Sequence, residues 1–235
     1  MKFENTETWG FEHALRGMRN PMNSWDKSDS FDCEHRAGRL DGCKFCPINK
    51  ICLNFKERFI IGENDMKLAK SLIKAGSEHR KFMRQIFVAV DITAPLYWWK
   101  ELDTYKVGTV SNSTSTMHKL ASTPITRDCF EMDDFENIES FKEESMWINV
   151  IGWCEQLRQK YNETNDKRYW KELIRLLPES WLQKRTITMN YENVLNMIHQ
   201  RRNHKLTEWS ESFIGWAKTL PYADELLFIK KEVKE

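Results

Sequence analysis

The sequence predicts an α+β fold that is dominated by helices and carries a small antiparallel sheet. Apolar residues recur at helical spacing along residues 146–161 and again along 169–176, as they do in amphipathic helices. Two short runs rich in β-branched or aromatic residues, 86–90 and 186–189, are typical of strands. The chain of 235 residues is long enough to bury a sizeable core, so we expect a single domain over residues 1–235.

The N-terminal part of the chain gives few local signals. Residues 1–30 have no clear period apart from a short helix expected at 11–18. Asn64 or Asp65 can cap a longer helix that ends before Gly76. Short polar side chains accept hydrogen bonds from the first turn of a helix, and glycine suits the C-terminal end.

The centre of the chain is the most informative part. After the expected strand at 86–90, Thr93 and Pro95 favour a helix start, because a first-turn proline gives up no hydrogen bond, and we expect a helix over 96–106. Hydroxyl and amide side chains then crowd residues 109–116. Such a cluster suits a pocket that holds phosphate or the edge of a nucleobase, and a solvated Ser/Thr turn is the alternative.

The C-terminal half is expected to be mostly helical. Residues 121–144 are acidic and irregular, which indicates a surface excursion. Amphipathic helices follow at 146–161 and 169–176, and the strand at 186–189 leads into a long helix from residue 190 to about 218.

Composition and charge exclude several classes of protein. Charged residues make up 30% of the chain, apolar residues 40%, and the formal net charge is +1. A protein without a strong net charge is not drawn to nucleic acid or to an anionic membrane, so we expect neither partner. The sequence lacks the run of about 18 apolar residues of a membrane span, and its N-terminus lacks the apolar region of a signal peptide, so we expect a cytoplasmic protein.

Two separated motifs carry a family resemblance. The first is Ala94-Pro95, followed by Thr104-Tyr105-Lys106 and by Asn112-Ser113-Thr114-Ser115. The second is Leu177-Pro178, followed by Asn190, Asn196, Arg201 and His204-x-x-x-Glu208. In this order they resemble the motifs APxxxxRQWxRHRxxSxNExSxRY and LP…NxR…N…R…HAQxE of the flavin-dependent thymidylate synthases, over residues 77–215.

The resemblance implies a fold like that of the thymidylate-synthase-complementing proteins, assembled as a homotetramer whose active sites are built from several chains. It also implies an enzyme in which reduced FAD supplies hydride and mediates one-carbon transfer from a methylenetetrahydrofolate to a pyrimidine deoxynucleotide such as dUMP. It assigns nucleotide contacts to Ser115, Arg201, Glu101 and Thr104. It assigns flavin contacts to Lys106, Asn112, Asn190, Asn196 and His79, and it leaves the catalytic residues unassigned.

The chain departs from the family's pattern at ligand-contacting positions. Lys106 is the one cation where the family has Arg-His-Arg, and Glu192 reverses the charge at the last position of its Asn-x-Arg, where it would oppose a phosphate. Neither tyrosine nor glutamate can replace an arginine fork on a phosphate, so we expect flavin affinity to be weaker than the family's, down to none. Nucleotide binding without catalysis, as in a sequestering protein, is the alternative function.

A cluster of four cysteines lies near the N-terminus, with the spacing Cys33-x9-Cys43-x2-Cys46-x5-Cys52. A Cys-x2-Cys pair lets two thiolates converge on one metal, and two outlying cysteines complete a tetrahedral set. We expect residues 31–58 to be a metal-binding insertion that holds zinc or a [4Fe–4S] cluster, with disulfides or free thiols as the alternatives. A metal-stabilised module that docks a partner is therefore a third candidate function.

Overall fold

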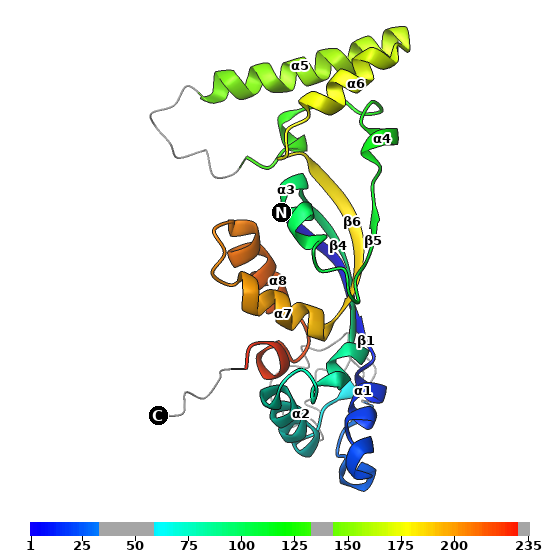
Figure 1. The fold of residues 1–235 in the computed structure, drawn as a ribbon, viewed down its shortest axis with the longest axis vertical. Helices are drawn as coiled ribbons and strands as arrows, with labels where there is room; N and C mark the ends of the chain where they lie inside the picture. Colours follow the sequence, from blue (N-terminus) through cyan, green and yellow to red (C-terminus); the bar gives the residue numbers. More distant parts are fainter. Residues whose placement is uncertain (33–58, 133–142, 230–235) are drawn as a thin grey trace, which may run out of the picture. The chain divides into compact units, whose positions relative to one another are not determined.

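Figure 1 shows the computed structural model, which describes residues 1–32, 59–132 and 143–229. The fold is α+β and rich in helices, with a small antiparallel sheet, as the sequence predicts. The chain forms two compact units. The first contains residues 1–6 and 89–188, and the second contains residues 7–88 and 189–235.

Four strands form the main sheet, in the order β1 (Lys2–Trp9), β4 (Phe87–Pro95), β6 (Leu182–Asn190) and β5 (Val110–Ser113). β5 runs antiparallel to β6 at the edge of this sheet. A separate antiparallel pair consists of β2 (Phe31–Asp32) and β3 (Phe59–Ile60). The described α-helices are α1 (Phe11–Met18), α2 (Glu63–Ala75), α3 (Leu96–Leu102), α4 (Thr116–Lys119), α5 (Glu143–Thr164), α6 (Lys167–Leu176), α7 (Tyr191–Arg201) and α8 (Ile214–Ala217).

The strand predicted at 86–90 is confirmed, and it continues further than expected. Every second residue of β4 is buried, which is the pattern of a strand with one face in the core. Thr93 therefore lies in the strand and caps no helix, and Pro95 ends the strand instead of opening the first helical turn. α3 ends at Leu102, so the predicted helix to residue 106 is too long.

Two strands of the main sheet have no clear signal in the sequence. β1 carries mostly polar and charged residues, and its place beside β4 explains its extended conformation better than its composition does. β5 lies within the hydroxyl-rich run 109–116, and all four of its residues are exposed. This part of the run is an exposed edge strand, so the alternative interpretation of a solvated Ser/Thr turn does not hold for residues 110–113.

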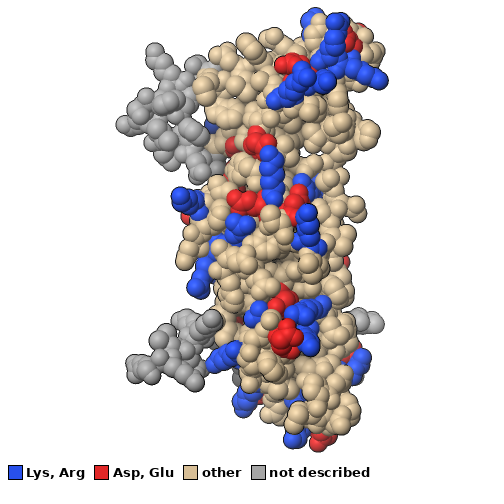
Figure 2. All heavy atoms as spheres, in the orientation of Figure 1, with Lys and Arg blue, Asp and Glu red and all other residues tan. Residues whose placement is uncertain are grey.

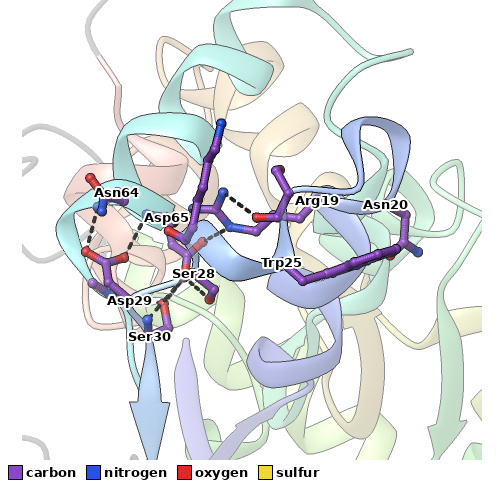
Figure 3. A network of polar contacts seen from close by, with 11 residues as sticks. Arg19, Asn20, Trp25, Ser28, Asp29, Ser30, Asn64 and Asp65 are labelled. Atoms are coloured by element: carbon purple, nitrogen blue, oxygen red, sulfur yellow. Dashed lines mark hydrogen bonds and ion pairs between the residues drawn. The ribbon is translucent and has the colours of Figure 1, made fainter.

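The two N-terminal helices begin and end where the sequence predicts, except at the start of α2. α1 has the predicted bounds, and α2 ends at Ala75 before Gly76. The predicted N-cap of α2 is wrong, because Asn64 and Asp65 lie inside the helix. The carboxylate of Asp29 accepts hydrogen bonds from both of their backbone N–H groups, at 2.9 and 3.1 Å, and so caps the helix from a distant part of the sequence (Figure 3).

Asp65 is the centre of a buried polar network in the same unit (Figure 3). Its Oδ1 accepts a hydrogen bond from Arg19 Nε at 2.6 Å, and its Oδ2 accepts from the hydroxyl groups of Ser28 and Ser30 at 2.7 and 2.5 Å. Burial alone would raise the pKa of Asp65, but the hydrogen bonds from Ser30, Ser28 and Arg19 outweigh it and lower the pKa. The network joins the residues just before β2 to the helix just after β3.

The C-terminal half is helical, with one correction. The two amphipathic helices are confirmed as α5 and α6, which pack against each other, and the strand predicted at 186–189 lies within β6. The single helix expected from 190 to 218 is wrong, because α7 ends at Arg201 and a π-helical segment, Glu208–Phe213, leads into α8. In the turn between them, His204 Nδ1 accepts a hydrogen bond from the backbone N–H of Leu206.

Each unit has its own apolar core. Large, fully buried side chains of the first unit include Trp98, Trp99, Ile92 and Ile187, and those of the second include Leu15, Met83, Tyr191, Trp209 and Phe213. Cys154 lies in a further cluster of the first unit, beside Leu120, Phe130 and Leu173, where burial raises the pKa of its thiol. Among the described residues, no helix is long and apolar enough to cross a membrane.

The predicted metal site, Cys33, Cys43, Cys46 and Cys52, lies outside the described residues. β2 precedes residues 33–58 in the sequence and β3 follows them, and these two strands pair with each other. In the described parts of the chain, no group of three or more His, Cys, Asp or Glu side chains could hold a metal ion. Metal binding by the four cysteines therefore stays a prediction.

Candidate functional site

In the first unit, a rigid polar cluster joins α3 to β6. The indole Nε1 of Trp99 donates to the backbone oxygens of Ala94 and Gln183, both at 3.0 Å, which fixes the ring. The guanidinium of Arg185 stacks on this ring, 4.3 Å from its centroid. Arg185 Nη1 donates to Asp103 Oδ1 at 2.9 Å, so β6 holds the residue that follows α3.

Gln183 connects this cluster to the hydroxyl-rich run. Its Oε1 accepts a hydrogen bond from Arg185 Nε at 2.9 Å, and its Nε2 donates to the backbone oxygen of Thr114 at 2.8 Å. The same Nε2 lies 3.4 Å from the hydroxyl oxygen of Thr116. Because Gln183 is buried and both ends of its amide are bonded, it fixes the backbone that enters α4.

Four of the predicted nucleotide and flavin contacts lie in the last turn of α3 or on the connections that flank this cluster. Ser115 is the N-cap of α4, and its Oγ accepts a hydrogen bond from the backbone N–H of His118 at 3.2 Å. Thr104 is exposed and donates to the carbonyl oxygen of Glu101 at 2.7 Å. Glu101 is half-buried and Lys106 is exposed. β6 contacts both of the segments that carry these residues, through Arg185 to Asp103 and through Gln183 to Thr114.

Asn112, a predicted flavin contact, lies on the opposite face of the sheet. It pairs in register with Thr186, and neighbouring residues of a strand alternate between faces, so Asn112 and Arg185 point to opposite sides. On the face of Asn112, Asp91 accepts hydrogen bonds from the hydroxyl of Thr186 at 2.6 Å and from Asn5 Nδ2 at 3.0 Å. These two hydrogen bonds are the main reason that the pKa of Asp91 is lowered.

In the second unit, Arg80 and the first two turns of α7 form another polar cluster. Arg80 donates from Nε and Nη2 to the two carboxylate oxygens of Glu192, at 2.8 and 3.0 Å, and from Nη2 to Asn196 Oδ1 at 3.2 Å. Glu192 is buried, with only 7% of its surface exposed. Arg80 offsets its charge within the protein, whereas the expectation that Glu192 opposes a ligand phosphate assumes an unpaired carboxylate.

The two predicted flavin-contacting asparagines of the second unit are both held by the protein. Asn190 caps α7, and its Oδ1 accepts from the backbone N–H of Asn193 at 2.9 Å in a reciprocal capping box. The Nδ2 groups of Asn190 and Asn196 have no hydrogen-bond partner among the described residues. His79, the third flavin candidate of this unit, is exposed, and its neighbour Arg80 is the residue that reaches α7.

Arg201, a predicted nucleotide contact, is the last residue of α7. Its guanidinium lies 5.0 Å from the ring centroid of Trp209, which is fully buried. Stacking on a buried indole restricts an arginine side chain without removing its charge. Arg201 is half-buried, whereas the next residue, Arg202, is exposed.

The sequence reasoning missed Arg80, Gln183 and Arg185. A usable signal exists for the last two, because Gln183, Lys184 and Arg185 are consecutive polar residues within a strand. Alternate strand residues share a face, so one or two of the three must face the core, and a core-facing polar group needs a partner. Lys184 faces the other way and pairs with Glu4 at 3.2 Å. We find no comparable signal for Arg80.

Charges of both signs are mixed on the molecular surface. On the face that Figure 2 shows, basic side chains of the described residues lie close to acidic ones. The exposed ion pairs of the described residues include Lys100–Glu179, at 2.6 Å. This mixture agrees with the formal net charge of +1.

Comparison with solved structures identifies the fold. Two crystal structures of thymidylate synthase X, a flavin-dependent thymidylate synthase from Helicobacter pylori, match this chain with TM-scores of 0.66 and 0.63, and both contain FAD and dUMP. Sequence identity is 16% in each case, and the matches cover 97% of this chain and 97% and 98% of the other chains. No protein-family model matches the sequence, and no curated protein is significantly similar to it. The chain therefore has the fold of a flavin-dependent thymidylate synthase, as its motifs predict.

Proposed function

We propose that this protein is an enzyme of the thymidylate synthase type, which binds a pyrimidine deoxynucleotide and transfers a one-carbon unit to its base with reduced flavin. The observation that carries the proposal is the fold match over 97% of the chain to synthases that contain FAD and dUMP. The motifs at residues 94–115 and 177–208 support it, because they occur in the family's order.

The nucleotide would be held by donors that the fold already positions. Arg201 is stacked on Trp209, and Ser115 is fixed at the start of α4 with its hydroxyl hydrogen still able to donate. Thr104 lies on the connection that follows α3, and Glu101 lies in the last turn of α3. On the motif resemblance we assign both to the nucleotide, Thr104 as a donor and Glu101 as an acceptor. Arg201 is the charged donor of this set, and a preorganised guanidinium suits a phosphate oxygen.

The polar groups at the flavin positions fit a flavin that is held weakly. The capping box orients Asn190 and Arg80 orients Asn196, so each presents an Nδ2 donor without rearrangement. Lys106 and His79 are exposed and able to meet anionic oxygens, and Asn112 lies on an exposed strand. Reduced flavin, when bound, supplies the hydride and mediates the transfer from a methylenetetrahydrofolate. The residues of this chain bind and orient the reactants.

Nucleotide sequestration without catalysis is the second candidate, and one observation favours it. Arg80 directs its guanidinium to Glu192 and Asn196, so it offers no open fork to a flavin phosphate. A protein of this kind would keep the nucleotide contacts and lose the flavin.

Tests for bound flavin, for dUMP binding and for catalysis, made on the purified protein, separate these functions. Mass spectrometry of released small molecules and the flavin absorbance band test for bound flavin, and calorimetry tests for dUMP binding. Conversion of dUMP to dTMP, with reduced FAD and methylenetetrahydrofolate supplied, tests catalysis. Product formation supports the enzyme, and dUMP binding without flavin binding supports sequestration. A protein that binds neither dUMP nor FAD would contradict both. Light scattering tests the expected homotetramer.

A further inference from the structure

We propose that Arg185 binds a phosphate oxygen of the ligand and helps to select phosphorylated ligands over unphosphorylated ones. The motif comparison does not assign this residue. The inference rests on the proposed function, because it names a phosphate contact beside the predicted nucleotide-binding residues of the first unit.

Arg185 is held as a rigid, nearly buried cation. Its guanidinium lies 4.3 Å from the centroid of the Trp99 ring, and its Nε donates to Gln183 at 2.9 Å. Trp99 and Gln183 are themselves fixed by backbone oxygens, at Ala94 and Thr114 respectively. Only 15% of the arginine side chain is exposed, so little side-chain freedom is lost when it meets a ligand.

The remaining donors of Arg185 are available. Its Nη2 has no hydrogen-bond partner among the described residues. Ser113 pairs with Arg185 in the β5–β6 register, and Ser111 lies on the same face of β5 because strand residues alternate. Both serines are exposed, and in the described part of the chain neither hydroxyl has a partner. A guanidinium edge beside two hydroxyl groups offers several donors to one tetrahedral oxyanion.

The sequence gives a reason for a cation at this place. Thr104 and Tyr105 stand where the resembled family has Arg-His, so the connection after α3 retains Lys106 as its cation. Arg185 reaches this connection from β6, through its hydrogen bond to Asp103. The strand thus brings a guanidinium to the segment that has lost one.

Asp103 is the competing partner. Its side chain is 54% exposed, and an ion pair with so exposed a carboxylate stabilises a protein little. A phosphate dianion carries more charge and more acceptor oxygens than a carboxylate, so we expect it to displace or share this contact. Removal of Asp103 should therefore leave phosphate binding unchanged or strengthen it.

Calorimetry of four protein forms tests the inference: the unmodified chain, Arg185→Ala, Asp103→Ala and Lys184→Ala. Lys184 is the control, because it neighbours Arg185 but faces the opposite side of β6. The probes are dUMP, deoxyuridine, FAD and riboflavin. Arg185→Ala should weaken binding of a phosphorylated probe by about 10- to 100-fold, the range for one charged hydrogen bond, and leave the unphosphorylated partner unchanged. A loss for dUMP places the nucleotide phosphate at Arg185, and a loss for FAD alone places the flavin phosphate there.

Two results would overturn the inference. One is equal affinity of Arg185→Ala and the unmodified protein for dUMP and for FAD. The other is an Asp103→Ala variant that weakens binding as much as Arg185→Ala, since Arg185 would then act only by holding the connection after α3. If Arg185→Ala does not fold, Arg185→Lys keeps the charge, loses the fork and should weaken the same probe. If the unmodified protein binds neither dUMP nor FAD, the proposed function fails, and stabilisation by inorganic pyrophosphate, compared between it and the Arg185 variant, still tests the inference.

Discussion

Replacement of Arg80 by methionine should lower the free energy of unfolding by about 3 kcal/mol, because it leaves a buried carboxylate without its partner. Arg80 and Glu192 expose 14% and 9% of their side chains, and hydrogen bonds of 2.8 and 3.0 Å join them. Removal of one partner of a buried pair costs about 3–5 kcal/mol, and we take the lower value because both side chains keep some contact with water. Methionine keeps much of the arginine's volume, so a cavity adds little to the cost.

A double-mutant cycle, measured by urea unfolding, isolates the pair. Glu192→Gln should cost less than Arg80→Met, because glutamine still accepts a hydrogen bond from Arg80. The double variant should be more stable than the sum of the two costs predicts, by about 0.5–3 kcal/mol. Lys81→Met is the matched control, since Lys81 pairs with Glu78 at 3.8 Å and is 66% exposed. It should change the stability by less than about 0.5 kcal/mol.

Additive costs, or an Arg80→Met variant as stable as the Lys81→Met control, would refute this reasoning. Either result would mean that Glu192 is unpaired in solution and free to repel a flavin phosphate. The pair also decides which substitution can restore the arginine of the resembled Asn-x-Arg motif, since Glu192→Arg alone removes the partner of Arg80. In the structure this change sets two guanidinium groups against each other, and only the exchange of Arg80→Glu with Glu192→Arg keeps an ion pair.

Three further predictions address the ligand, the pH response and the metal. Arg201→Ala should weaken dUMP binding by about 1.5–3 kcal/mol in calorimetry, while the exposed Arg202→Ala should not; unchanged binding in both would remove Arg201 from the site. Hydrogen bonds from Arg158, with help from the Ile125 backbone N–H and Gln159, overcome the effect of burial and lower the pKa of Glu155 to about 2, from 4.5. Because the pKa is lowered in the folded state, the ionised Glu155 stabilises the protein fully above about pH 4.5. This stabilisation is lost as the pH falls through about 2. Glu155→Gln should therefore be less stable than the unmodified protein at pH 7 by about 1–3 kcal/mol in urea unfolding, and a difference that does not shrink between pH 5 and 2 would contradict this. Purified protein should contain one zinc ion or iron–sulfur cluster per chain by elemental analysis, and Cys46→Ser should release it; metal-free protein with all four thiols open to alkylation would exclude the site.

Local signals were sufficient for the elements whose own residues carry the pattern. Apolar periodicity or a terminal glycine predicts α1, the end of α2, α5 and α6 within a few residues. β-Branched residues predict the C-terminal part of β6. β1 could not be predicted, because its neighbour in the sheet and not its own composition favours an extended chain. The cap of α2 could not be predicted either, since Asp29 lies 35 residues from the N–H group of Asn64 that it binds.

The candidate site divides in the same way. The positions of Ser115, Asn190 and Arg201 follow from motif spacing, and the structure gives each a defined local role. The residues that balance charge near these positions come from other elements of the fold. Arg80 is brought to α7 by the fold, at a sequence distance of 112 residues from Glu192, and no spacing rule within a motif covers such a distance.

Loss of a motif arginine is therefore not equivalent to loss of positive charge at the site. In one unit, Arg80 cancels the reversed charge of Glu192. In the other, Arg185 brings a guanidinium from β6 to the connection where Thr104 and Tyr105 stand at the Arg-His of the resembled motif. Charge at a binding site depends on every element packed against it, whereas a motif reports on one segment. This is why the divergent motif lowers the affinity that we expect for flavin and yet is compatible with the phosphorylated ligand that we propose.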